Sequence, residues 1–360
     1  MGPTGSSFAL ADRDACSQGS KTSEFMAVGV VTLMSAEARG DERGSENRLQ
    51  AVSVIIPLYN KKPTISRAIR SVLNQRSVEF EIIVIDDGST DKPEEIIRAF
   101  GDLVRFERQE NSGPSAARNY GARLSRYPVL LFLDADDELL PDSLFNYLRL
   151  RRQVPDLRLT IGSFQVMLGD SVEREELVPR RIPNLDRIDG GYLASQFYSD
   201  LVTNIASGAI CVDKELFNQV GGFDEALWCW EITDLMYRLV LQAGRVGIPV
   251  GVQLVVHKND VNSQFEKTQR DLYYQIHFAH RLLDKMEAVP AAQRDAFLRS
   301  VKYALYSTLH GGELSSLRAL ANRARRYGED IPEIMKFCRI ARLPPFLIRG
   351  WLALRKLYRD

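Results

Sequence analysis

Four short apolar runs, each separated from the next by a helical segment, constrain the fold of this chain most strongly. The runs are AVSVIIPLYN (51–60), EFEIIVIDDGSTD (79–91), LVRFERQ (103–109) and PVLLFLDADD (128–137), and they have the composition of strands. The segments between them, 64–75, 94–100 and 115–125, are typical of helices. Strands that alternate with helices predict a parallel α/β sheet with right-handed crossovers.

Polar residues follow three of these strands, as PLYN, DDGSTD and DADD. In open α/β sheets, ligands bind at the carboxyl ends of the strands. We therefore expect the polar chemistry of this chain to gather at one edge of the sheet. Further along, residues 151–200 are less regular, the alternating pattern resumes over 203–258, and 265–360 are predicted to be helical.

Composition excludes several classes of protein. The 47 Lys and Arg residues balance the 47 Asp and Glu residues, so bulk charge does not indicate a nucleic-acid partner. The four cysteines form no CxxC pair and fit a reducing cytoplasm, where we expect the protein to be located. No apolar run reaches the ~18 residues that span a bilayer. Residues 1–49 are predicted to be a poorly ordered leader.

Four acids, Asp134, Asp136, Asp137 and Glu138, crowd together directly after an apolar strand. One interpretation is a helix N-terminus with Pro141 in its first turn, which would explain the later acids but not Asp134. The other is a metal site, because like charges this close repel each other and a divalent cation offsets the repulsion. Mg²⁺ or Mn²⁺ binds one or two carboxylates and completes its shell with phosphate oxygens and water.

The segments VSVIIPLYN, IDDGSTD, NSGPSAARNYG and LFLDADD, in this order, resemble the family 2 inverting glycosyltransferases of the GT-A fold. The resemblance covers roughly residues 52–257. It implies an α/β fold with a mixed sheet flanked by helices, and a nucleotide-sugar donor, with a UDP-sugar expected first. It also implies transfer of the sugar, with inversion, to a hydroxyl of a saccharide or lipid-linked acceptor, in polysaccharide or glycolipid synthesis.

The same resemblance divides the chain into parts. Residues 50–260 would form the catalytic domain, in which 50–150 bind the nucleotide sugar and 151–260 face the acceptor. Residues 261–360 would form a C-terminal helical region. No G-x-G-x-x-G motif follows the first strand, which argues against a dinucleotide-binding dehydrogenase.

The resemblance also implies roles for single residues. Those implied to bind the nucleotide sugar are Pro57, Tyr59, Asp86, Asp87, Asn111, Gly113, Arg118, Asp134 and Asp137. Among them, Asp87 would accept a hydrogen bond from the nucleobase, and Arg118 would contact the diphosphate or hold the acidic loop. Asp136 and His257 would bind the metal, Mn²⁺ or Mg²⁺. The structural alternatives are a tight turn for DDGSTD and a strand-end role for His257.

The general base is the point at which the chain departs from the family pattern. VGGFDEAL (220–227) resembles the acceptor-side loop, but the position of the usual catalytic Asp is occupied by Ile232. An inverting transfer needs a base within hydrogen-bond reach of the attacking hydroxyl. We expect Glu231 to take this role, with Asp234 second. The alternative is that both acids are structural, with a surface pair to Arg238, and that the chain is a non-catalytic nucleotide-sugar-binding homologue.

The last 25 residues, 336–360, carry seven Lys and Arg residues and one Asp, interleaved with apolar and aromatic residues. This composition is typical of a basic helix at a membrane interface, which predicts a peripheral contact with the inner face of the membrane. The alternative is a helix packed on the catalytic domain or on a partner subunit of a homo-oligomer.

Overall fold

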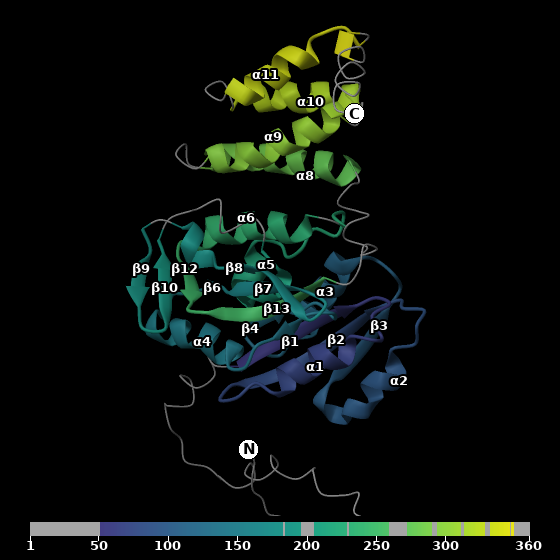
Figure 1. Ribbon diagram of the computed structural model, residues 1–360, viewed down its shortest axis with the longest axis vertical. Helices are drawn as coiled ribbons and strands as arrows, with labels where there is room; N and C mark the ends of the chain where they lie inside the picture. Colours follow the sequence, from purple (N-terminus) through teal and green to yellow (C-terminus); the bar gives the residue numbers. More distant parts are fainter. Residues whose placement is uncertain are drawn as a thin grey trace, which may run out of the picture. The chain divides into compact units, whose positions relative to one another are not determined.

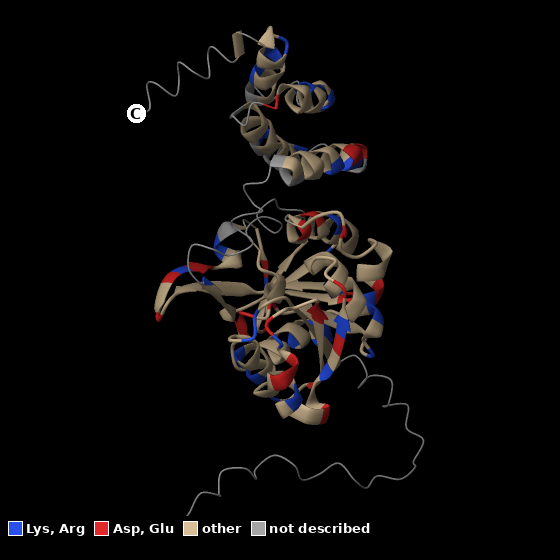
Figure 2. Ribbon diagram, turned by 90° about the vertical axis from the view of Figure 1, so that its right-hand side faces the viewer, with Lys and Arg blue, Asp and Glu red and all other residues tan. Residues whose placement is uncertain are grey.

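A computed structural model of the chain describes residues 51–182, 184–195, 205–228, 230–258, 272–289, 294–310, 313–327, 332–345 and 347–348. The leader predicted over 1–49 lies outside the described residues, as does the end of the basic tail, 349–360. Figure 2 shows acidic and basic residues mixed over the sheet and its helices, in line with the equal numbers of the two in the sequence.

A nine-stranded mixed sheet, in the order β3-β2-β1-β4-β11-β6-β12-β10-β9, forms the centre of the fold (Figure 1). Its parallel half contains β1 (Ala51–Leu58), β2 (Glu79–Asp87), β3 (Arg105–Gln109) and β4 (Val129–Phe132). The helices between these strands are α1 (Ile65–Leu73), α2 (Glu94–Ile97) and α3 (Pro114–Leu124). The predicted alternation is thus confirmed. α1 is shorter than expected by one residue at its start and two at its end, and α2 ends three residues early, where a 3-10 helix, η3 (Arg98–Leu103), follows it and contains Gly101 at a φ of 53°.

The inner strands β1 and β4 are mainly apolar because both faces of the sheet are covered there, whereas the edge strand β3 (RFERQ) has no fully buried residue. β1 is buried except for the half-buried Pro57. On one face α3 approaches β1 closely at Gly121, where an added Cβ would lie 2.4 Å from Cγ2 of Ile55. Arg118 precedes Gly121 by three residues and so lies on the same face of α3. The close packing at Gly121 therefore fixes the place of Arg118 beside the strand ends.

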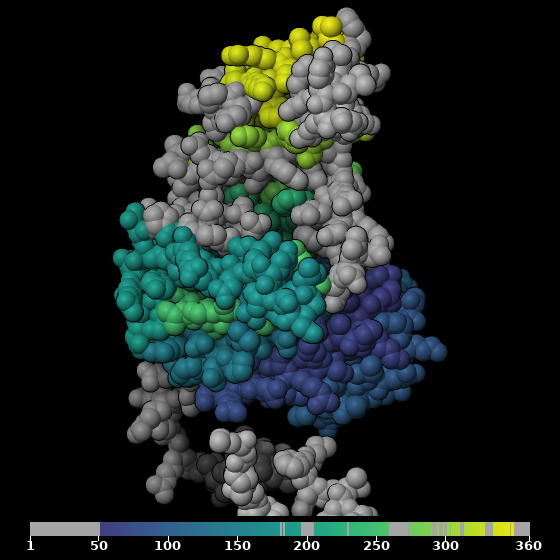
Figure 3. Space-filling view, in the orientation of Figure 1, coloured from purple at the N-terminus to yellow at the C-terminus, as the bar shows by residue number. Residues whose placement is uncertain are grey.

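The second half of the large sheet contains β11 (Ile210–Asp213), antiparallel to β4, then β6 (Leu159–Ile161), β12 (Val246–Pro249), β10 (Gly191–Ala194) and β9 (Asp186–Ile188). A four-stranded sheet contains β5 (Glu138–Leu139), β13 (Val252–Lys258), β7 (Ser163–Leu168) and β8 (Ser171–Glu176). Further helices are α4 (Ser143–Gln153), α5 (Lys214–Gln219) and α6 (Glu231–Ala243). The stretch expected to be irregular therefore supplies short strands to both sheets. Figure 3 shows the two halves, purple to blue and teal, as one continuous surface.

The C-terminal region contains α8 (Leu272–Lys285), α9 (Arg294–His310), α10 (Leu314–Arg325) and α11 (Pro332–Ala341), which confirms the predicted helices. Their apolar side chains belong to the same hydrophobic core as those of α6. In α11, Phe337 is buried and Ile340 packs against this core, so the helical start of the basic tail packs on other helices, whereas Leu343 and Leu347 further along are exposed. Within the described ranges, no helix is both long and apolar enough to cross a bilayer.

Candidate active site

Hydrogen bonds tie the loops after β1 and β2 to each other. The backbone amide of Asn60 donates to Oγ of Ser89 (3.0 Å), and the side-chain oxygen of Asn60 accepts from the amide of Thr90 (2.8 Å). Asn60 has a φ of 51°, a left-handed conformation that Asn tolerates better than most residues. Pro57 and Tyr59, the implied nucleoside contacts, precede this junction and are half-buried. The two loops therefore form one rim at the carboxyl edge of the sheet.

The two acids of the DDGSTD motif differ in their surroundings. Asp86 is fully buried, accepts from the amide of Ser89 (2.9 Å) and pairs with Arg108 (3.1 Å). Asp87 holds the next loop instead. It accepts from the side chain of Gln109 (2.8 Å) and from the amides of Ser112 (2.8 Å) and Gly113 (2.9 Å). A carboxylate offers about four lone pairs, so one acceptor position of Asp87 is left for a ligand.

The loop 111–113 is shaped by close approaches. A Cβ on Gly88 would lie 2.9 Å from the backbone N of Asn111. Asn111 itself is exposed. Gly113 has a φ of 89°, and a Cβ there would lie 3.1 Å from the indole of Trp228. Trp228 directly follows the segment 220–227, so the loop after β3 and the end of this segment approach each other at Gly113. The sequence analysis did not single out Trp228.

The acids after β4 do not begin a helix. Glu138 lies in β5, and α4 begins only at Ser143, so the interpretation of this cluster as a helix N-terminus is wrong. Basic side chains partner the first two acids instead. Arg118 Nη2 lies 2.8 Å from Asp134, and Lys61 Nζ lies 2.5 Å from Asp136. Lys61 lies three residues after the end of β1, and its charge, opposite to that of the acids, was the only sequence signal for this pair.

The last two acids face the end of β13. Asp137 is buried and accepts from the backbone amide of His257 (3.1 Å). Nε2 of His257 lies 2.7 Å from Oε1 of Glu138, which the sequence analysis left without a role. Burial raises the pKa of Asp137 well above its ordinary value, and the charges of Asp134 and Asp136 raise it further. Three carboxyl groups are therefore close enough to repel one another.

A divalent cation would fit this loop as a further partner of the carboxylates, beside Arg118 and Lys61. Within the described part of the chain, no three Asp, Glu, His or Cys side chains are grouped as a complete metal site. The side chains of Asp134 and Asp136 remain 31% and 23% exposed, so their oxygens are open to a ligand. Mg²⁺ commonly takes only one or two carboxylates and fills its remaining positions with phosphate oxygens and water. The donor set therefore suits a metal that arrives with a diphosphate.

Arg118 connects the acidic loop with the start of α6. It is 4% exposed, and its guanidinium contacts Asp134 at 2.8 Å and Glu231 at 3.1 Å. The ring of Phe223 lies 5.2 Å from its Cζ. A planar guanidinium with several donors can bridge two carboxylates in this way, whereas an ammonium cannot fix both directions. Glu231 is thus held beside the residues implied to bind the diphosphate.

Burial raises the pKa of Glu231 above its ordinary value, and the neighbouring Arg118 opposes this effect. Trp230, directly before it, has a φ of 69°, which is uncommon for a bulky residue. Such a conformation costs roughly 1–3 kcal/mol and persists only where the surroundings enforce it. Glu231 therefore begins α6 from a strained turn, as a buried carboxyl whose affinity for a proton is increased.

Asp234, the second candidate for the base, has different neighbours. Its side chain is 1% exposed, so its pair with Arg238 (2.5 Å) is buried rather than at the surface as the structural alternative assumed. Arg281 lies 3.4 Å and Lys285 3.7 Å from its other oxygen. Three cations thus surround this carboxylate. The structure brings Glu231, not Asp234, together with the implied donor-binding residues.

The strand order, the paired loops at the carboxyl edge and the acidic loop after β4 define a nucleotide-sugar transferase of the GT-A type. Comparisons with known proteins agree with this class. The model of Glycosyl transferase family 2 matches residues 53–156. Two relatives from Haemophilus influenzae, both described as uncharacterized glycosyltransferases, are 40% identical over 217 residues (50% of this chain, 86% of the relative) and 25% identical over 237 residues (62% and 75%).

Further similarity is to proteins of Staphylococcus aureus. The poly(ribitol-phosphate) beta-N-acetylglucosaminyltransferase TarP is 41% identical over 108 residues, 28% of this chain and 33% of TarP. The crystal structure of TarS 1–349 in complex with UDP-GlcNAc superposes with a TM-score of 0.54 at 16% identity, covering 81% of this chain and 90% of TarS 1–349. At this identity the superposition shows the fold alone. The chain belongs to glycosyl transferase family 2 and is a glycosyltransferase.

Proposed function

We propose that this glycosyltransferase moves a sugar, with inversion, from a UDP-sugar to a hydroxyl of a saccharide or lipid-linked acceptor, and that Glu231 is the general base. The observation that carries the proposal is the bridge from Asp134 through Arg118 to Glu231. It places a buried carboxyl next to the residues implied to hold the diphosphate. The family pattern has its base one residue later, at Ile232, and Glu231 takes over that function.

The chemistry follows from the charges around the site. Glu231 accepts the proton of the acceptor hydroxyl while the oxygen attacks the anomeric carbon from the face opposite the diphosphate. Its raised pKa makes the carboxylate a better proton acceptor than an ordinary Glu. Asp134 and Asp136 would hold Mn²⁺ or Mg²⁺, and Asp137 would support their loop. When bound, the metal offsets the negative charge that develops on the departing nucleoside diphosphate.

Asp87 would accept a hydrogen bond from the nucleobase at its remaining acceptor position, and Tyr59 would lie beside the ring of the nucleobase. The choice of UDP is supported by TarS, which binds UDP-GlcNAc, and by TarP, an N-acetylglucosaminyltransferase. The same two names support a role in polysaccharide synthesis. Peripheral attachment to the inner face of the membrane and assembly into a homo-oligomer stay predictions, as does a direct contact of His257 with the metal.

Two variants test the proposal. Ligand at about 100 times its dissociation constant adds roughly 2.7 kcal/mol of stability, so binding of UDP with Mn²⁺ is visible as a shift in the melting temperature. Asp136→Asn should lose the metal-dependent part of this shift. Glu231→Gln should bind UDP as the unmodified protein does but should not hydrolyse UDP-GlcNAc to UDP and N-acetylglucosamine, a reaction in which water takes the place of the acceptor hydroxyl. Turnover by Glu231→Gln at the unmodified rate would refute the assignment of the base.

If UDP, GDP and dTDP all leave the melting temperature unchanged, the whole proposal is refuted. The non-catalytic alternative is favoured in that case only if a nucleotide sugar still binds. That alternative predicts donor binding without turnover. If the unmodified protein releases the nucleotide from its sugar and Glu231→Gln does not, the protein is a catalyst and the non-catalytic alternative is wrong.

A further inference from the structure

The C-terminal helix α8 contacts α6 on both sides of Glu231. On one side, the ring of Phe278 stacks on Trp230, the residue directly before Glu231, with ring centroids 5.8 Å apart and an interplanar angle of 12°. On the other side, Arg281 lies 3.4 Å from Asp234, which is one helical turn after Glu231. Residues of the C-terminal helix α8 therefore contact the residue before the proposed base and the acid one turn after it.

The carboxylate of Asp234 is almost completely shielded from water. Its side chain is 1% exposed, and Arg238 from the same helix occupies its Oδ2 at 2.5 Å. Oδ1 faces Arg281 and Lys285, both from α8. A buried charge is costly unless it is paired, so the α8 cations are needed where they are. The pair consequently links the position of α8 to that of α6.

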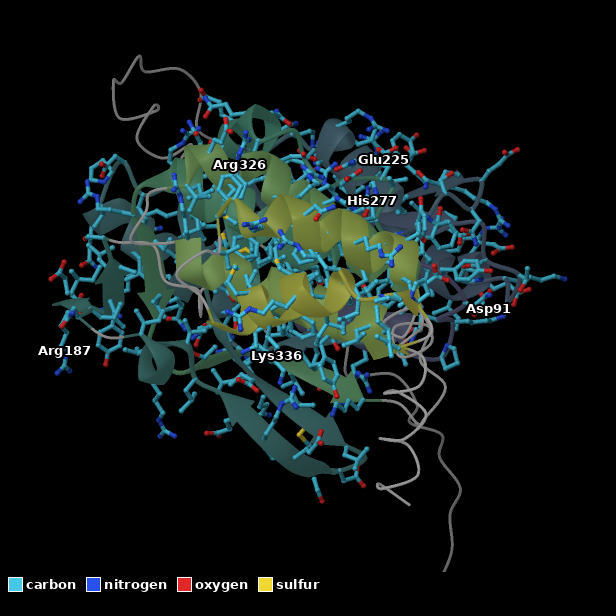
Figure 4. The ribbon with its side chains drawn as sticks, turned by 90° about the horizontal axis from the view of Figure 1, so that it is seen from above. Asp91, Arg187, Glu225, His277, Arg326 and Lys336 are labelled. Atoms are coloured by element: carbon cyan, nitrogen blue, oxygen red, sulfur yellow. The ribbon has the colours of Figure 1, made fainter. Side chains whose placement is uncertain are left out.

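The same arginine also holds the acceptor-side loop. Arg281 Nη1 forms an ion pair with Asp224, a residue of VGGFDEAL. Arg238 Nη1 donates to the carbonyl oxygens of Val220 (2.8 Å) and Gly222 (2.5 Å) in that loop. Figure 4 labels Glu225 of the loop and His277 of α8 on the side where loop and helix meet. One side chain of α8 thus reaches both the start of α6 and the loop that precedes it.

We propose that Arg281 is a positioning residue for the transfer reaction. By pairing with Asp224 and Asp234 together, it sets where Glu231 lies relative to the acceptor-side loop. This proposal rests on the proposed function, in which Glu231 is the base. Displacement of a catalytic group by about 1 Å can cost on the order of 100-fold in rate, so a residue that fixes this geometry affects turnover without touching the substrate.

The test uses the full chain, Mn²⁺ and UDP-GlcNAc, and compares release of UDP with binding of UDP. We expect Arg281→Met to lower kcat by about 10- to 100-fold while the dissociation constant of UDP changes less than about twofold, since no donor contact is altered. Arg281→Lys, which keeps a cation, should restore much of kcat. Asp284→Asn is the matched control, because it breaks an ion pair of α8 with Arg323 of α10 and does not reach α6.

Each outcome bears on a different claim. If the unmodified protein neither binds UDP nor releases it from UDP-GlcNAc, the proposed function fails, and this inference with it. If it turns over and Arg281→Met keeps its kcat, only this inference is overturned. Equal losses of kcat in Arg281→Met and Asp284→Asn would mean general loosening of α8 and would also overturn it. If Arg281→Met does not fold, Asp224→Asn tests the same claim, because it removes the pair of Arg281 with the loop and keeps its pair with Asp234.

Discussion

Removal of the Arg118 guanidinium should leave two carboxylates without their shared cation. Taking one partner away from a buried ion pair costs about 3–5 kcal/mol. Glu231 is 10% exposed and would bear most of this cost, whereas Asp134 is 31% exposed and can turn toward water. We therefore expect Arg118→Met to lower the free energy of unfolding by about 3 kcal/mol, the lower end of that range.

The loss of unfolding free energy in Arg118→Met should depend on pH, and the titration of Glu231 sets the direction of this dependence. Burial raises the pKa of its carboxyl in the folded chain, and loss of Arg118 raises it further. In the unfolded chain the proton leaves at a lower pH, so the folded state binds more protons between the two pKa values and stability falls as the pH rises through that window. Arg118→Met should accordingly be less damaging at pH 5 than at pH 7.

Equilibrium unfolding in urea at the two pH values measures both effects. Arg151→Met is the matched control, because Arg151 is 10% exposed and pairs with Asp213 (3.3 Å). It should lose stability without this pH dependence and keep its release of UDP. Glu231→Gln added to Arg118→Met should recover part of the loss, since interacting residues show coupling energies of roughly 0.5–3 kcal/mol. A loss under about 1 kcal/mol, or one equal at both pH values, would refute the reasoning.

Two other perturbations follow from the packing. Burial lowers the pKa of Lys285 to about 8 from 10.5, so the unfolded chain binds the extra proton between these values and stability rises there with pH. Relative to Lys285→Met, the unmodified chain should gain stability in urea unfolding as the pH rises from about 8 to 10.5, and parallel pH curves would contradict this. Gly121→Ala should cost about 1–3 kcal/mol, because the new methyl would press into Ile55, and an unchanged urea midpoint would speak against that close contact.

The order of strands and helices in the first half of the fold was predictable from the sequence. β1 and β2 are eight and nine residues long and mostly buried, so their apolar runs stand out in the sequence. The placement of polar residues at one edge followed from the rule that ligands bind at the carboxyl ends of parallel strands. The short strands over 151–200 were not predictable, since three to six residues carry too little pattern.

The candidate donor site was predictable as a set of residues but not as a set of contacts. The sequence placed Asp134, Asp136 and Asp137 together because they are neighbours in the chain. It did not show that Asp87 holds the following loop through three hydrogen bonds. Nor did it show that Lys61, 75 residues before Asp136, is its partner. Contacts between loops at the same sheet edge depend on the register of the strands, which a single sequence does not carry.

The tertiary structure, not the sequence, distinguishes the surroundings of Glu231 from those of Asp234. From the sequence alone, both are acids on the first turn of a helix, three residues apart, and neither stands at the position of the usual base. The fold turns one toward Arg118 and the acidic loop and the other toward the cations of α8. Residues three apart on a helix differ in direction by about 60°, and this difference decides which carboxyl faces the donor side. The sequence by itself indicated the enzyme class and the motifs implied to bind the donor, and long-range packing supplies the contacts on which we propose Glu231 as the base.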